Sequence, residues 1–232
     1  QWMYLSTPSN APVDYTIWPL PLNNATKITG TIDKLSPTET LVNNTDYYVI
    51  LPEGAKGANH NVFSQLFVRA ENAGTVTSNK GYYIEANAPI YVSIRYSANA
   101  QASGFVSKGE AALGKSFRTG GFTNGNPRDD NYLNFASVMA VEAGTTTVTF
   151  SDINNNAGDG YADMENIAEV YDGSGNIADI EITLNQFETF VIATRVPAKN
   201  NTEDPPSAAQ GLPYPITNRD ALIGMLIESD KN

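Results

Sequence analysis

Cysteine is absent from the 232 residues of this chain, and histidine occurs only once, as His60. The absence of cysteine excludes disulfides, zinc sites built on thiolates and a cysteine nucleophile. Ser-His-Asp catalysis would have to use His60, and the chain has no Gly-x-Ser-x-Gly nucleophile elbow to accompany it. We therefore expect His60 to be an ordinary loop residue.

Basic residues and long apolar runs are also scarce. The chain has 14 Lys and Arg against 25 Asp and Glu, so its formal net charge at pH 7 is −11. Nucleic acids and anionic lipid surfaces attract basic protein surfaces, so neither is expected as a partner. No apolar run approaches the roughly 20 residues of a membrane-spanning helix, so we expect no membrane insertion.

The residues that are abundant favour β-structure. Charged residues make up only 17% of the chain, with 12 Tyr, 9 Phe and many Thr. Aromatic and β-branched residues are enriched in strands. In residues 145–150, Thr146, Val148 and Phe150 share one face of an expected strand, and Gly144 before it suits a turn with positive φ. Short runs of this kind, bounded by Gly, Asn and Pro, predict strands at 14–18, 46–51, 65–70, 82–86, 90–96, 135–142, 145–150, 180–184 and 189–196.

The fold class follows from this pattern. We expect an all-β, antiparallel protein, because no long stretch has a sustained helical period. The best helix candidates, residues 109–116 and 218–226, are short and interrupted by glycine. Two tandem β-sandwich-like units with long loops account for the number of strands, and blades of a β-propeller are the alternative.

An internal repeat supports two units. The similar pairs of segments are 41–50 with 183–192, 81–89 with 224–232 and, more weakly, 3–18 with 136–150. We interpret them as two copies of one β-unit, although unrelated hairpins can also resemble one another. The expected domains are a first β-unit at 1–96, a connecting segment at 97–116 and a second β-unit at 117–232.

The second unit is expected to be incomplete at its C-terminal end. In the first copy, the strand at 82–86 is followed by the strand at 90–96, which we expect to pair with it. The second copy has no counterpart of that following strand, so residues 223–229 are expected to fray. The chain is therefore expected to be part of a longer one.

The order of several segments resembles a known family. "NKGYYIEANAPIYVSIRY", "GFVSKGEAALGKSFR", "NYLNFASVMAVEAGTTTVTF", "LNQFETFVIA" and "LIGMLIESDKN" follow one another along nearly the whole chain. They resemble the N-terminal regions of large gliding-motility-associated surface adhesins of Bacteroidota. These adhesins are exported by the type IX secretion system, and the regions are similar to the N-terminal domain of the IgG-Fc-binding protein.

The resemblance implies a secreted adhesin or surface-filament segment at the outer-membrane exterior, with further domains in the same chain. It would act by binding and not by catalysis, so no catalytic residue is transferred. Its partners would be a surface polysaccharide, a solid substratum, or the secretion and motility machinery. The competing hypothesis is a carbohydrate-active enzyme or carbohydrate-binding module, for which Glu85 and Glu142 are one possible acidic pair.

The segment "SDINNNAGDGYADM", residues 151–164, departs from the family pattern and is the one candidate metal site. Calcium prefers six to eight oxygen ligands on a loop that bends back on itself. In the spacing of a calcium loop, the first, third, fifth, seventh and twelfth positions are Asp152, Asn154, Asn156, Gly158 and Asp163. Ala157 stands where the sharp turn requires glycine, and no helix flanks the loop. A weak calcium site and a solvated hairpin loop are both compatible with these residues.

The aromatic residues near the N-terminus give a second candidate surface. Trp2, Tyr4, Tyr15 and Trp18 could stack on carbohydrate, but they also alternate as the core residues of a hairpin would. We favour the core interpretation.

Overall fold

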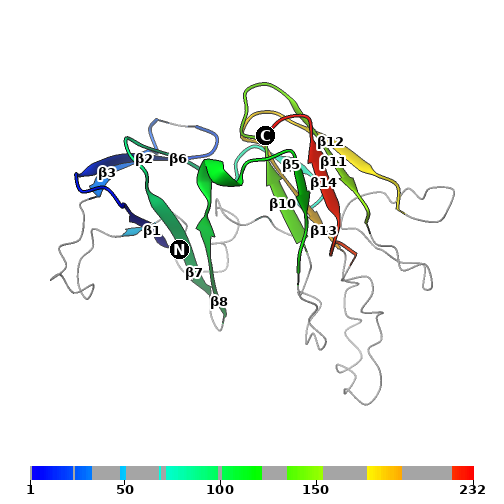
Figure 1. Ribbon diagram of the computed structural model, residues 1–232, viewed down its shortest axis with the longest axis horizontal. Coiled ribbons are helices and arrows are strands. Elements are labelled where there is room, and N and C mark those ends of the chain that lie inside the picture. Colours follow the sequence, from blue (N-terminus) through cyan, green and yellow to red (C-terminus); the bar gives the residue numbers. More distant parts are fainter. Residues whose placement is uncertain are drawn as a thin grey trace, which may run out of the picture. The chain divides into compact units, whose positions relative to one another are not determined.

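The computed structural model describes residues 2–22, 24–32, 48–50, 68, 72–98, 101–121, 135–153, 177–194 and 221–232. For residues 2, 48–50, 96–98 and 101–103 it describes the backbone only. The expected all-β, antiparallel fold is confirmed, because the strands of the described part pair antiparallel (Figure 1). The chain forms two compact units. Unit 1 contains Gln1–Phe67 and Asn79–Leu113, and unit 2 contains Val68–Ser78 and Gly114–Asn232.

Unit 1 contains two sheets. Sheet A has the strand order β4-β1-β7-β8, and sheet B has the order β3-β2-β6. The bounds are β1 Trp2–Ser6, β2 Val13–Pro19, β3 Ile28–Ile32, β4 Tyr48–Ile50, β6 Tyr82–Ala86, β7 Tyr91–Ala98 and β8 Gln101–Ser107. A short 3-10 helix, η3 Gly109–Ala112, follows β8.

One core joins the two sheets of unit 1. Alternate residues of a strand point to the same face, so each strand gives the core every second side chain. Met3 and Leu5 of β1 and Val92 and Ile94 of β7 are buried with Ile17 of β2. Residues of sheet A and sheet B therefore share one apolar cluster, as in a β-sandwich.

Unit 2 also contains two sheets. Sheet C has the order β10-β13-β5, and sheet D has the order β12-β11-β14-β9. The bounds are β5 Val76–Thr77, β9 Ser116–Arg118, β10 Phe135–Met139, β11 Thr146–Ser151, β12 Ile180–Leu184, β13 Thr189–Ala193 and β14 Leu226–Ser229.

The core of unit 2 lies between these sheets. Phe150 of β11 and Phe190 of β13 are buried, and their ring centroids are 5.6 Å apart. Thr146, Val148 and Phe150 share the buried face of β11, as the sequence predicted. Gly144 has the expected positive φ, 81°, in the turn before that strand. Each unit thus has two sheets around one core, whereas a propeller blade is a single sheet.

Five strands of each unit share the same connectivity. The central strand β2 pairs with β3 and β6, and β11 pairs with β12 and β14. In the other sheets β1 pairs with β4, and β10 pairs with β13. The registers also agree. In unit 1, Tyr15 pairs with Gly30 and Ala86 across the sheet, a row that we write Gly30–Tyr15–Ala86. At the equivalent positions of unit 2, Val148 pairs with Ile182 and Ser229.

The structure changes one register of the repeat that the sequence predicted. Matching segment 41–50 with 183–192 makes Ile50 equivalent to Ile192. The pairing instead makes Val49 equivalent to Ile192, because Met3 pairs with Val49 and Ala136 pairs with Ile192. A shift by one residue exchanges the two faces of a strand, so sequence similarity alone did not give the register of this strand.

Three further expectations differ from the structure. Residues 97–113 belong to unit 1 and include the whole of β8 and η3, whereas a connecting segment was expected at 97–116. The helix candidate 109–116 holds only the short helix η3, and the described part of 218–226 is a turn that leads into β14. Strand β14 is not left unpaired, because it lies between β11 and β9.

Candidate functional site

Two aromatic side chains lie on the outward face of sheet B. Ile17 and Ile84 belong to the core cluster, so the alternate positions Trp18 and Tyr83 point away from it. Trp18 and Tyr83 are cross-strand partners, with ring centroids 5.6 Å apart and an interplanar angle of 35°. Each ring is half-buried. The pair therefore presents aromatic surface outside the core.

Polar groups border this aromatic pair. The Tyr83 hydroxyl donates a hydrogen bond of 2.7 Å to Glu85 Oε1, and Trp18 Nε1 donates one of 3.4 Å to Asn24 Oδ1. The hydrogen bond to Glu85 is the largest cause of the raised pKa of Tyr83, followed by burial and by the negative charges of Glu85 and Glu110. The hydroxyl thus stays protonated as a donor. We call Trp18, Tyr83, Asn24 and Glu85 the Trp18–Tyr83 surface.

The aromatic residues near the N-terminus fall into different environments. Tyr15 packs against the core of unit 1, where burial raises the pKa of its hydroxyl. Tyr4 is exposed on sheet A, and Trp18 lies on the outward face of sheet B. The core interpretation therefore holds for Tyr15 and is wrong for Tyr4 and Trp18. The side chain of Trp2 lies outside the described part.

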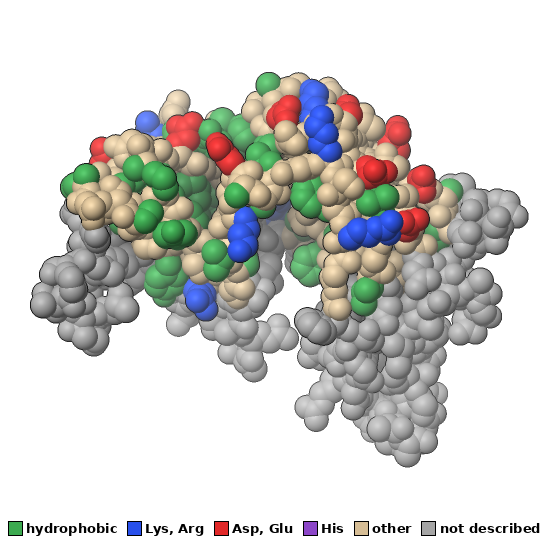
Figure 2. All heavy atoms as spheres, viewed as in Figure 1, with side chains coloured by type: hydrophobic (Ala, Val, Ile, Leu, Met, Phe, Trp, Pro, Cys, Tyr) green, Lys and Arg blue, Asp and Glu red, His purple; other side chains and the backbone are tan. Residues whose placement is uncertain are grey.

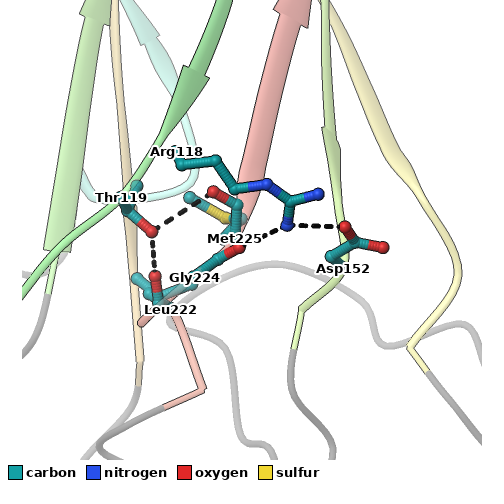
Figure 3. A network of polar contacts seen from close by, with 6 residues as sticks. All are labelled: Arg118, Thr119, Asp152, Leu222, Gly224 and Met225. Carbon is teal, nitrogen blue, oxygen red and sulfur yellow. Dashed lines mark hydrogen bonds and ion pairs between the residues drawn. The ribbon is translucent and has the colours of Figure 1, made fainter.

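Asp152 is the one candidate calcium ligand among the described residues. It follows β11 with a φ of 53°, in the left-handed region that Asp adopts more readily than most residues. Its Oδ2 lies 2.7 Å from Arg118 Nη1, and both side chains are more than half exposed (Figure 3). The carboxylate that would head a calcium site is therefore neutralised by an arginine in this structure.

Arg118 and Thr119 also attach β9 to the turn before β14. Arg118 Nη1 donates 2.7 Å to the Gly224 carbonyl, and the Thr119 hydroxyl donates to the carbonyls of Leu222 and Met225 (Figure 3). The Gly224 N–H donates 2.9 Å back to the Thr119 carbonyl. Asp152 thus belongs to a structural network of polar contacts in sheet D.

The other residues of the calcium hypothesis, Asn154, Asn156, Gly158 and Asp163, lie outside the described residues, as does His60. Within the described ranges, no group of three or more His, Asp or Glu side chains could hold a metal ion. The same ranges hold no helix that is long and apolar enough to cross a membrane.

Glu85 and Glu142, the acidic pair of the enzyme hypothesis, belong to different units. Glu85 accepts the hydrogen bond of Tyr83, and Glu142 Oε1 accepts one of 3.1 Å from the Asn232 N–H. Each carboxylate therefore has a local partner of its own.

Sequence reasoning missed the Trp18–Tyr83 surface, although one signal for it was present. In "YYIEA", residues 82–86, Tyr83 and Glu85 are two residues apart, so a strand places them on the same face. The pairing of β6 with β2, which brings Trp18 to Tyr83, cannot be read from either strand alone.

In the view of Figure 2, hydrophobic, acidic and basic side chains are interspersed over the described surface.

The chain was also compared with known proteins. No family model matches it, and neither a curated protein nor a solved structure does.

Proposed function

We propose that this chain is part of a secreted cell-surface adhesin that binds an uncharged polysaccharide through the Trp18–Tyr83 surface. The observation that supports the proposal is the outward aromatic pair with hydrogen-bonding groups at its border. The resemblance to gliding-motility adhesins supports the location at the cell surface, with further domains in the same chain.

The chemistry of this surface suits a sugar polymer. The C–H faces of pyranose rings stack on aromatic rings, and their hydroxyls exchange hydrogen bonds with carboxylates and carboxamides. Glu85 and Asn24 supply such groups beside Trp18 and Tyr83. The net charge of −11 disfavours acidic polymers, so a neutral glycan is the expected ligand.

The experiment measures binding of the full chain to a panel of neutral polysaccharides by affinity electrophoresis. Trp18→Ala and Tyr83→Ala should each weaken binding about tenfold or more, because an aromatic platform carries much of the contact energy. Tyr91→Ala is the matched control, since Tyr91 is exposed on sheet A and lies outside the Trp18–Tyr83 surface. Its binding should equal that of the unaltered chain.

The same panel separates binding from catalysis. If the Trp18→Ala and Tyr83→Ala variants are folded and still bind, as strongly as the unaltered chain, every polysaccharide that it binds, the proposed surface is wrong. Release of reducing ends by the unaltered chain would contradict an adhesin without catalytic activity. Glu85→Gln then tests whether the carboxylate acts as an acid or only as a hydrogen-bond acceptor.

A further inference from the structure

Strand β10 has one unpaired edge where its counterpart β1 has a neighbour. In unit 1, β1 lies between β4 and β7, with Leu5 opposite Val92 and Met3 opposite Ile94. In unit 2, β10 pairs with β13 on one side, and among the described residues no strand pairs with its other side.

The core of unit 2 is less covered at this edge. Met3 and Leu5 of β1 are 0% and 4% exposed. Their equivalents Ala136 and Val138 pack against the core of unit 2 but are only partly buried. Phe135, the first residue of β10, is 66% exposed, the largest value among the exposed large hydrophobic residues of the described part. In unit 1, Val92 and Ile94 of β7 lie opposite the residues that correspond to Val138 and Ala136.

The residues that directly follow β6 in unit 1 and β14 in unit 2 make the same backbone contacts. In unit 1 the Asp14 N–H donates 3.0 Å to Asn87 Oδ1, and the Asn87 N–H donates 3.1 Å to the Asp14 carbonyl. In unit 2 the Thr147 N–H donates 2.9 Å to Asp230 Oδ1, and the Asp230 N–H donates 3.2 Å to the Thr147 carbonyl.

Two residues later, both units place the chain beside the connection between the first two strands. Pro89 accepts a 2.8 Å hydrogen bond from the Thr7 hydroxyl, directly after β1. Asn232, its equivalent, donates to Glu142 after β10, and Lys231 Nζ donates 3.1 Å to the Ala143 carbonyl. In unit 1 the chain turns from Pro89 into β7, which runs antiparallel to β1.

We propose that the open edge of β10 accepts an added strand of the β7 type, in the way that β1 accepts β7 in unit 1. The strand runs antiparallel to β10 and inserts two bulky apolar side chains, at alternate positions, beside Val138 and Ala136. It enters next to Asn232, because Asn232 holds the place of Pro89, from which the chain of unit 1 turns into β7. Pairing of an added strand with an exposed edge is a general mode of peptide recognition.

The test adds a copy of residues 90–107, the segment containing β7 and β8, directly after Asn232 of the full chain. Amide hydrogen exchange and thermal unfolding are then compared with those of the chain without the addition. We expect the amides of Phe135–Met139 that point away from β13 to exchange at least about tenfold more slowly. The unfolding temperature of unit 2 should rise by about 4 °C or more.

The control has the same length and composition. In it the first five strand residues, Tyr-Val-Ser-Ile-Arg, are reordered to Val-Ser-Ile-Arg-Tyr, so that valine and isoleucine fall on the outward positions. This control should leave the exchange of β10 unchanged. Equal protection by both additions, or protection of another edge such as β6, would overturn the proposal.

A second measurement covers the case in which the extended chain fails to fold. A free peptide of residues 90–98 is titrated into the unextended chain while the amide resonances of β10 are followed. Shifts confined to β10 and its neighbours support the proposal, and their absence at millimolar peptide contradicts it. If the unextended chain dimerises with β10 already protected, a second copy is the occupant and the proposal of a β7-type strand that enters next to Asn232 is wrong.

Discussion

Units 1 and 2 share the pairing of five strands but fill it with different side chains. The row Gly30–Tyr15–Ala86 in sheet B corresponds to Ile182–Val148–Ser229 in sheet D. In unit 1 a large ring, Tyr15, thus pairs with a glycine, Gly30. In unit 2 two β-branched residues of intermediate size, Val148 and Ile182, hold the same positions. The two rows show that the hydrogen-bonded frame is retained while individual side chains change.

The largest expected effect comes from the central core positions Ile17 and Phe150, which are equivalent in the two units. Both side chains are 0% exposed. Phe150→Ala should cost about 3–5 kcal/mol of the stability of unit 2, and Ile17→Ala about 2–5 kcal/mol of that of unit 1. Chemical denaturation followed at residue-resolved amides measures each unit by itself. Equal losses in both units from either change would contradict two separate cores.

A smaller effect tests the exchange of volume between Tyr15 and Gly30. A Cβ added at Gly30 would lie 2.5 Å from the Tyr15 hydroxyl oxygen, too close for any side chain without movement of the ring. Gly30→Ala should therefore destabilise unit 1 by about 1–3 kcal/mol.

The double variant Tyr15→Val, Gly30→Ile restores the combination found in unit 2. It should be more stable than Gly30→Ile alone, as a double-mutant cycle from thermal unfolding would show. Additive losses in that cycle would mean that the two rows are not interchangeable.

Loss of the side-chain hydrogen bond after β6 or β14 should lower the free energy of unfolding by about 1 kcal/mol. Asn87→Ala and Asp230→Ala each leave one exposed backbone N–H without its side-chain acceptor. Asp230→Asn should be nearly neutral, because asparagine makes the same pair of contacts in unit 1. Urea unfolding of the three variants measures this order, and a loss from Asp230→Asn as large as that from Asp230→Ala would contradict it.

The smallest effect concerns the ion pair of Arg118 and Asp152. Because both side chains are more than half exposed, Asp152→Ala should cost at most about 1 kcal/mol. If Asp152, Asn154, Asn156, Gly158 and Asp163 bind calcium, Arg118 competes with the ion for Asp152. Millimolar calcium should then raise the melting temperature, and more so in Arg118→Ala. If the thermal unfolding curves in calcium and in chelator coincide, the segment binds no calcium and is a solvated hairpin loop.

The sequence predicted the position of several strands but missed others, such as β1, β3 and β8, and it predicted strand partnership poorly. The strand expected at 65–70 lies almost wholly outside the described residues. Residues 82–86 and 180–184 were predicted with their observed bounds, because alternation and flanking turn residues are local signals. The strand that includes Tyr91 was expected to pair with the strand before it, but β7 pairs with β1. That choice depends on which sheet covers the shared core, and such long-range packing leaves no local pattern.

The candidate site shows the same division between local and long-range information. Asp152 was recognised from its oxygen-rich surroundings, while its contact with Arg118 joins segments far apart in the sequence. The Trp18–Tyr83 pair likewise depends on the register between β2 and β6.

The central claim is that β10 keeps the place of β1 but, among the described strands, has a neighbour on one side only. Residue-resolved amide hydrogen exchange of β1 and β10 in the unextended chain tests it most directly. We predict slow exchange at Met3 and Tyr4, which have strand neighbours on both sides, and at Leu5, which pairs with β7. In β10, slow and fast amides should alternate, because those that point away from β13 are open to water. Uniformly slow exchange from Phe135 to Met139 in the monomeric chain would contradict the claim.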